Sequence, residues 1–135
     1  MLIYFSVDDV ARGAKTLGGG AGPTGLYGLM LRGWTLRKGV PSEKLRKEIA
    51  KWVELLSNRS PPYALYRAMN NSRVLPADIK PGVRPLAAGK TTMRLISACN
   101  IAQTGRQATT TCGNTQLCAG TRAGIEGNLH AVRAI

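Results

Sequence analysis

Two adjacent carboxylates, Asp8 and Asp9, follow an apolar run near the start of the chain. Paired carboxylates of this kind hold the Mg²⁺ ions of two-metal sites, where the ions activate an attacking hydroxyl and stabilise the leaving group. Such chemistry needs a further carboxylate from a neighbouring strand, and Asp78 is the only other aspartate in the sequence. We therefore expect a solvated pair at the end of a strand and no metal site.

Two glycine-containing segments have the spacing of phosphate-binding loops. Residues 20–25 match the dinucleotide fingerprint, but no apolar strand leads into them and Pro23 removes a backbone amide, so we predict a flexible linker. Residues 89–92 are similar to the end of a P-loop, but Arg84 stands where the first glycine is required. What remains there is a simple anion site at a helix N-terminus, with Lys90 beside it.

Glu126 and His130 are spaced to lie side by side on a helix, where a carboxylate can tune an imidazole as a general base. No nucleophile accompanies them, so a surface pair is the preferred interpretation. Cys99, Cys112 and Cys118 have spacings that match no zinc motif, and His130 is the sole histidine. We expect the cysteines to be buried free thiols.

Charge is the strongest compositional signal. In 135 residues, 19 Lys and Arg oppose 7 Asp and Glu, which gives a formal net charge of +12. No acidic residue occurs between Ile79 and Ile125. Such a chain is typical of proteins that bind nucleic acid through phosphate contacts, and an anionic membrane surface is the weaker alternative. The cations of this acid-free stretch are Lys80, Arg84, Lys90, Arg94, Arg106 and Arg122.

The length of the chain fits one domain. The sequence signals for helices and strands are weak in the first 25 residues and stronger after them. Residues 1–17 suggest a short strand followed by polar sequence, and residues 1–25 as a whole are expected to be a poorly ordered segment with a Gly-rich linker. From Pro41 the pattern predicts a helix that Ser42 caps and that buries one apolar face. That face comprises Leu45, Ile49, Trp52, Val53 and Leu56.

A Pro-Pro pair ends this helix, and residues 63–69 permit a short second one. Residues 73–79 and 83–87 flank a Lys-Pro-Gly turn, which predicts an antiparallel hairpin. The prolines within it, Pro76 and Pro85, place both strands at edges.

A third helix is expected from Thr91 or Thr92 to Ala102, and a fourth from about Ile125. The fold class is therefore α+β, mostly helical with a small antiparallel β-hairpin. The start of the chain lacks a basic leader, and no apolar run approaches the roughly 20 residues that cross a bilayer. We predict an intracellular protein, nuclear or cytoplasmic, that is neither secreted nor bound to a membrane.

Several short sequence words occur in a fixed order: SPPYALYR (60–67), PGVRPL (81–86), MRLI (93–96), AC (98–99), TCGNTQLCAG (111–120), AGIEG (123–127) and HAVR (130–133). Across residues 19–135 this order resembles the amino-terminal, fingers-side part of reverse transcriptases of the non-LTR retrotransposon type. The resemblance implies a partial reverse-transcriptase fingers subdomain at residues 26–135, truncated before the catalytic palm.

The resemblance implies that Arg84 contacts the triphosphate of an incoming nucleotide (dNTP), a task that suits the bidentate fork of arginine. Lys80, Lys90 and Arg94 are further candidates for phosphate binding. A later segment is implied to approach the template, where glycines permit close passage of nucleic acid. The implied template-binding residues are Gln116, Gly120, Arg122 and Gly124.

The catalytic aspartates of that family lie on palm strands beyond the last matched helix. The Asp8 and Asp9 pair cannot replace them, because it precedes the fingers segment. We therefore expect a truncated or relic fragment that binds RNA or DNA but is not an enzyme alone and has no cofactor of its own. A complete family member would need Mg²⁺, and a palm-containing polypeptide is a candidate partner. The alternative is a small basic RNA-binding or structural protein unrelated to polymerases.

Overall fold

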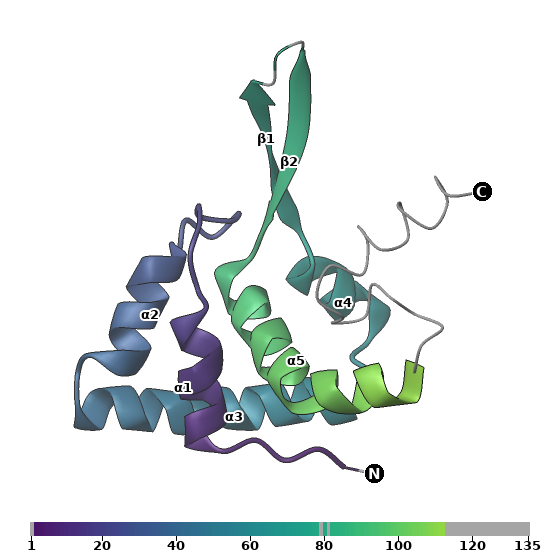
Figure 1. Cartoon of the computed structure of the whole chain (residues 1–135). Coiled ribbons are helices and arrows are strands. Elements are labelled where there is room, and N and C mark those ends of the chain that lie inside the picture. The colour runs from purple at the N-terminus through teal and green to yellow at the C-terminus, as the bar shows by residue number, and fades with distance from the viewer. Residues whose placement is uncertain (1, 79, 81, 113–135) are drawn as a thin grey trace, which may run out of the picture. The chain divides into compact units, whose positions relative to one another are not determined.

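The computed structural model describes residues 2–78, 80 and 82–112, and these form five helices and one two-stranded antiparallel sheet (Figure 1). The predicted α+β class is confirmed. The chain divides into two compact units, residues 1–100 and 101–135. The elements are α1 (Val7–Lys15), α2 (Gly28–Leu36), α3 (Val40–Asn58), α4 (Tyr63–Met69), β1 (Ser72–Asp78), β2 (Val83–Gly89) and α5 (Thr91–Cys112).

The strand that the sequence analysis expects near the start of the chain is absent: residues 2–6 have no regular secondary structure, and the segment that follows forms helix α1 from Val7. Its N-cap is Ser6, whose Oγ accepts a hydrogen bond from the Asp9 amide at 3.2 Å, while the Asp9 carboxylate accepts one from the Ser6 amide at 2.7 Å. This reciprocal capping box stabilises a helix start by about 1 kcal/mol. The prediction of a strand is wrong, and the capping box instead starts a helix in the polar sequence that is expected to be poorly ordered.

The same segment reaches the hydrophobic core. Phe5, Val10, Ala14 and Leu17 are buried, and Val10 and Ala14 are spaced to lie on one face of α1. Residues 1–25, predicted to be a poorly ordered segment with a linker, thus supply four core side chains. The boundary predicted at residue 25 stays a prediction.

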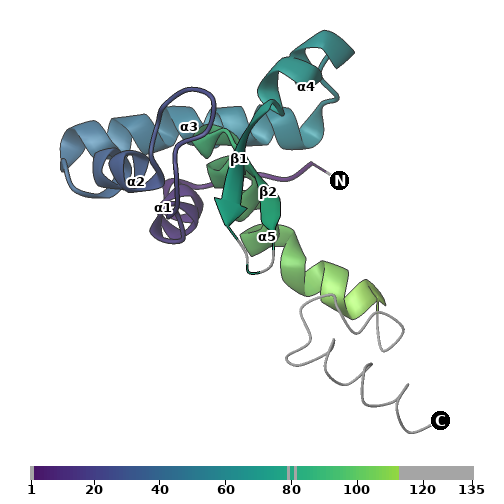
Figure 2. The same ribbon diagram turned by 90° about the horizontal axis from the view of Figure 1, so that it is seen from above.

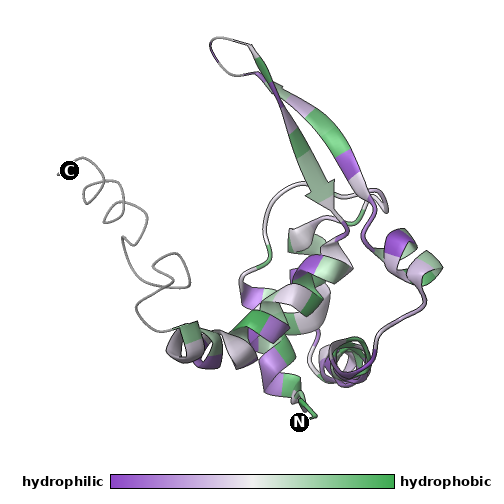
Figure 3. Cartoon of the chain, turned by 90° about the vertical axis from the view of Figure 1, so that its right-hand side faces the viewer, coloured by the Kyte–Doolittle hydropathy of each residue, from purple (hydrophilic) through white to green (hydrophobic). Residues whose placement is uncertain are grey.

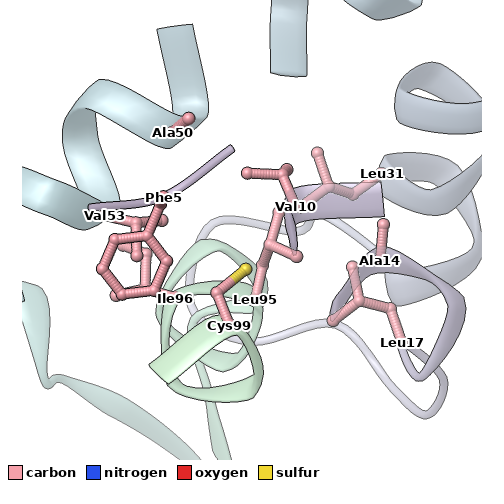
Figure 4. Close-up of a cluster of buried hydrophobic side chains, with 10 residues drawn as sticks. All are labelled: Phe5, Val10, Ala14, Leu17, Leu31, Ala50, Val53, Leu95, Ile96 and Cys99. Carbon is pink, nitrogen blue, oxygen red and sulfur yellow. The ribbon is translucent and has the colours of Figure 1, made fainter. Parts of the chain in front are cut away.

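The rest of the core comes from three further helices (Figure 4). Helices α1 and α2 pack against each other and against α3, as the two views of Figures 1 and 2 show. Helix α5 adds side chains that point into the same cluster in Figure 4. The core residues outside the first segment are Leu31, Ala50, Val53, Leu95, Ile96 and Cys99.

Helix α3 confirms the helix predicted from Pro41, with two corrections. It begins after Gly39, and Ser42 is not its cap: the Ser42 hydroxyl accepts a hydrogen bond from the Lys38 amide at 2.8 Å and donates one to the Trp34 carbonyl at 2.6 Å. Ser42 therefore joins α3 to the end of α2. Trp52, predicted to be on the buried face, is 59% exposed, because Ala50 and Val53 carry the contact with the core.

Helix α2 is absent from the sequence expectations. Its interior contains Gly33, which lowers helix propensity, and the sequence analysis treats its apolar residues only as a run too short for a membrane. Tertiary contacts stabilise it: Leu31 and Thr35 are buried, and the Ser42 hydroxyl of α3 donates to the Trp34 carbonyl at 2.6 Å. Among the described residues, no helix combines the length and the apolar character that crossing a bilayer requires.

The predicted short helix and the predicted hairpin are confirmed as α4 and as β1 with β2. In the hairpin Pro76 lies directly opposite Pro85. Neither proline has an amide hydrogen, so the pair fits a position of the ladder that exchanges no hydrogen bonds. The hairpin extends away from the helices of the first unit, and Figure 3 shows hydrophobic residues along its exposed length.

Helix α5 confirms the predicted third helix. The fourth predicted helix, from about Ile125, lies outside the described residues.

Candidate nucleic-acid interface

The β-hairpin presents two arginines on one of its faces. Arg73 is paired with Ala88 and Arg84 with Ala77 across the antiparallel register. Because side chains alternate along a strand and paired residues share a face, Arg73 and Arg84 lie on the same face, about 14 Å apart along the strands. Asp78 has the opposite parity and lies on the other face. The hairpin thus has one cationic face.

These hairpin cations are available to a ligand. Arg73, Lys80 and Arg84 are exposed, and none of their side chains makes a hydrogen bond or an ion pair within the described part of the chain. An isolated two-stranded hairpin is marginally stable in water, so neutralising its charges on a polyanion would favour its folded form. Two of the predicted phosphate-binding residues, Arg84 and Lys80, are therefore free on the hairpin, and Arg73 is a third cation that the sequence analysis did not select.

The other two predicted phosphate-binding residues have structural contacts. The Lys90 ammonium donates a hydrogen bond to the Ala68 carbonyl in the last turn of α4. The positive charge there also interacts favourably with the negative end of the helix dipole. The Arg94 guanidinium donates to the carbonyls of Gly18 and Gly20, each at 2.9 Å. Lys90 and Arg94 thus tie α4 and the glycine-rich loop to the start of α5.

The start of α5 is covered by residues 18–26. Thr91 is fully buried, and its hydroxyl donates to the Leu26 carbonyl. The backbone of Gly22 lies against the carbonyl of Gly89 so closely that no side chain would fit between them. The two glycine-containing segments therefore pack on each other. Gly22 of the predicted linker serves close packing here, and the helix start that we considered as an anion site is covered by the chain itself.

Asp8 and Asp9 do not form the solvated pair that the sequence predicts at a strand end. Asp9 is 3% exposed and is paired with Arg12 and Ser6, while Asp8 is exposed in the first turn of α1. Among the described residues, no group of three or more His, Cys, Asp or Glu could hold a metal ion. Asp9 stabilises the helix instead.

Several predicted residues lie outside the described part of the chain. They are the template candidates Gln116, Gly120, Arg122 and Gly124, and the residues Cys118, Glu126 and His130.

The structure also shows an aromatic groove that the sequence analysis missed. It is open, has a volume of about 630 Å³, and is lined by the end of α3, the loop after it, α4 and α5. Tyr63 and Tyr66 of α4 line it and are 73% and 53% exposed. Their spacing of three residues places both rings on one helix face. This spacing, with a Pro-Pro pair before it, is the signal that sequence reasoning could have used.

Cys99 confirms the expectation of a buried free thiol, and Cys112 is partly buried. Burial raises the pKa of the Cys99 thiol from 9.0 to about 11, and the negative charge of Asp9 adds to the increase. The thiol therefore stays protonated and unreactive at neutral pH.

The raised pKa of Cys99 predicts a loss of stability in alkali. The unfolded chain releases the Cys99 proton near pH 9, whereas the folded chain holds it to about pH 11. The stability that the protonated thiol contributes to the folded state is therefore complete below pH 9 and is lost as the pH rises to about 11. Urea unfolding of the wild type and of Cys99→Ala at pH 7.5, 9 and 10.5 measures it. We expect the difference in unfolding free energy to shift against the wild type with rising pH, and a difference independent of pH would contradict the prediction.

No family model, curated protein or solved structure matches this chain. Its function is therefore argued from the hairpin and the groove.

Proposed function

We propose that this chain binds RNA or DNA through the cationic face of its hairpin. The observation that carries the proposal is the pair of exposed arginines, Arg73 and Arg84, which share one face without a carboxylate. Unpaired guanidinium groups bind phosphate oxygens in bidentate fashion, and each neutralised phosphate releases counterions. The net charge of +12 supports attraction of a polyanion over a longer range.

The finer proposal is that the chain corresponds to the fingers-side part of a reverse transcriptase. In that role Arg84 contacts nucleotide phosphates, and the carboxylates that hold Mg²⁺ come from a palm-containing polypeptide. The α+β fold and the exposure of Arg84 are compatible with this role. The chain alone would then bind nucleic acid without polymerising it.

A second candidate is a small RNA-binding protein unrelated to polymerases. The exposed tyrosines of α4 favour it, because they form an aromatic surface on an element other than the Arg84 strand. The variant Arg84→Ala distinguishes the two candidates. It should weaken nucleic-acid binding if the chain is a fingers-side fragment and leave that binding unaffected if the chain is an unrelated RNA-binding protein.

The salt dependence of binding tests the role of the hairpin. If some five phosphates are neutralised, the slope of log K against log salt for duplex DNA is about −4 to −5. Replacing Arg73 and Arg84 together by Gln removes two contacts and makes that slope shallower by about 2. Fluorescence anisotropy with a labelled duplex at several salt concentrations measures both slopes.

The matched control removes the same charge elsewhere. Arg37 and Lys44 are exposed on the α2–α3 side, and neither side chain makes a hydrogen bond or ion pair within the described part of the chain. Arg37→Gln with Lys44→Gln should leave the slope within about half a unit of wild type. Equal effects of the two double variants would show that only net charge matters, and a wild-type slope near zero would overturn nucleic-acid binding altogether.

A further inference from the structure

We propose that the groove beside α4 binds the unpaired bases of a single-stranded nucleic acid by stacking them on Tyr63 and Tyr66. This inference rests on the proposed nucleic-acid function and assigns it a second site, distinct from the cationic face of the hairpin. Figures 1 and 2 show the position of α4 next to the end of α3.

The groove has the size and the composition of a site for a flat ring. Its volume of about 630 Å³ lies within the range of small-molecule sites. Met93 and Ile96 of α5, with Leu56 of α3, supply an apolar floor, and the two tyrosines supply exposed aromatic faces. A nucleobase could contact the apolar floor and stack on a tyrosine ring. Such stacking needs only the flat face of a base, so it does not depend on base sequence.

The uncharged polar groups of the groove are partly available to a ligand. The Ser60 and Ser97 hydroxyls line it and make no hydrogen bond to another described residue. The amide of Asn70 uses its nitrogen to donate to the Tyr66 carbonyl at 3.0 Å, which leaves its oxygen as an acceptor. Hydroxyl and amide groups can pair with base edges, which present both donors and acceptors.

Charge around the groove favours a polyanion. Of the described residues that line it, Arg59 is charged and none is acidic. Arg67 lies over the Tyr63 ring, with its guanidinium carbon 5.8 Å from the ring centre. An exposed pair of this type is worth only about 0.5–1 kcal/mol. Arg67 therefore places a second cation beside Tyr63, where it can meet the phosphates of a strand stacked on that ring.

The occupant that fits these features is a single strand and not a duplex. In a duplex the faces of the bases are stacked on one another, so tyrosine rings on a helix cannot reach them. The groove also leads toward the hairpin: Asn70 lines it, and β1 begins two residues later, next to Arg73. One strand could therefore place bases in the groove and phosphates on the hairpin.

Variants of the two tyrosines test the proposal in the full chain. Tyr63→Leu with Tyr66→Leu should weaken binding of a labelled oligouridylate or oligothymidylate by about tenfold or more. Tyr63→Phe with Tyr66→Phe keeps the rings and should bind as the wild type does. Tyr27→Leu removes an equally exposed tyrosine at the start of α2 and should change affinity less than about twofold.

Salt dependence separates this site from the hairpin. The tyrosine variants should leave the salt slope for single strands unchanged, whereas the Arg73→Gln, Arg84→Gln variant makes it shallower. Full retention of single-strand affinity by the Leu double variant would overturn the groove proposal and leave the hairpin proposal standing. Absence of any nucleic-acid binding by the wild type would overturn both.

Crosslinking of the unmodified chain removes any dependence on variants that fold poorly. An oligonucleotide carrying 5-iodouridine reacts on irradiation with aromatic side chains that stack on it. Trypsin cleaves after Arg59 and Arg67, so one peptide, residues 60–67, carries both tyrosines. We expect the crosslink in this peptide, and a crosslink confined to other peptides would overturn the proposal.

Discussion

Replacing Leu95 by alanine is expected to destabilise the chain by about 2–5 kcal/mol. Leu95 is 1% exposed and lies in the cluster of buried side chains shared by α1, α2, α3 and α5. A void of about 50 Å³ already adjoins it, beside Leu31 and Ile49, so truncation would enlarge an existing cavity. Stabilities of single domains are about 5–15 kcal/mol, and this loss is a large share of them.

Urea unfolding followed by circular dichroism measures the effect of Leu95→Ala. The matched control is Leu86→Ala on β2, which removes the same atoms from a side chain that is 49% exposed. We expect the control to cost less than about 1 kcal/mol, because little apolar surface is returned to water. Similar midpoints for the two variants would mean that Leu95 does not occupy the core.

The parts of the fold that could be predicted from the sequence are those with strong local signals. The Pro-Pro pair ends α3 and starts α4, and the Lys-Pro-Gly turn lies between two apolar stretches that form the hairpin. Helices α3 and α5 have runs of apolar residues at helical spacing. Local sequence signals are sufficient to predict the order of these elements.

The first two helices show where local signals are insufficient. The capping box of α1 is present in the sequence as Ser6 and Asp9, but two adjacent carboxylates also match a metal site, and only the fold shows that Asp9 binds its own helix. Helix α2 contains Gly33 and depends on a hydrogen bond from Ser42 of α3 to the Trp34 carbonyl. The sequence signal of α1 is local but ambiguous, whereas α2 could not be assigned without its contact to α3.

The sequence likewise predicts some properties of the candidate site and not others. Composition predicts that the chain binds a polyanion, but it does not distinguish the free Arg84 from Arg94, whose partner Gly20 is 74 residues away in the sequence. Exposure of Tyr63 and Tyr66 is also a property of tertiary structure, since tyrosines on a short helix are as easily buried as exposed. Sequence reasoning proposes the type of ligand, and the structure shows which of the described candidate side chains remain exposed to solvent.

Gly22→Ala is expected to separate the glycine-rich loop from the start of α5 and to destabilise the chain by about 3 kcal/mol. A Cβ at this position would lie 2.8 Å from the Gly89 carbonyl carbon and 3.0 Å from the Cα of Lys90. Both neighbours are backbone atoms, so a side-chain rotation cannot relieve the overlap. Gly20→Ala in the same loop is the control, because a Cβ there has no neighbour within 4 Å. Urea unfolding should show less than about 1 kcal/mol for it.

Arg94 allows the cause of that loss to be tested. Its hydrogen bonds to the carbonyls of Gly18 and Gly20 require the loop to stay on α5, so Arg94→Ala should cost about 1.5–3 kcal/mol in the wild type and in Gly20→Ala. In Gly22→Ala these bonds are already broken, and Arg94→Ala should add little. Additive effects of Gly22→Ala and Arg94→Ala in this double-mutant cycle would contradict displacement of the loop. Non-additivity restricted to Gly22 would show that Gly22 acts by close packing and not by flexibility.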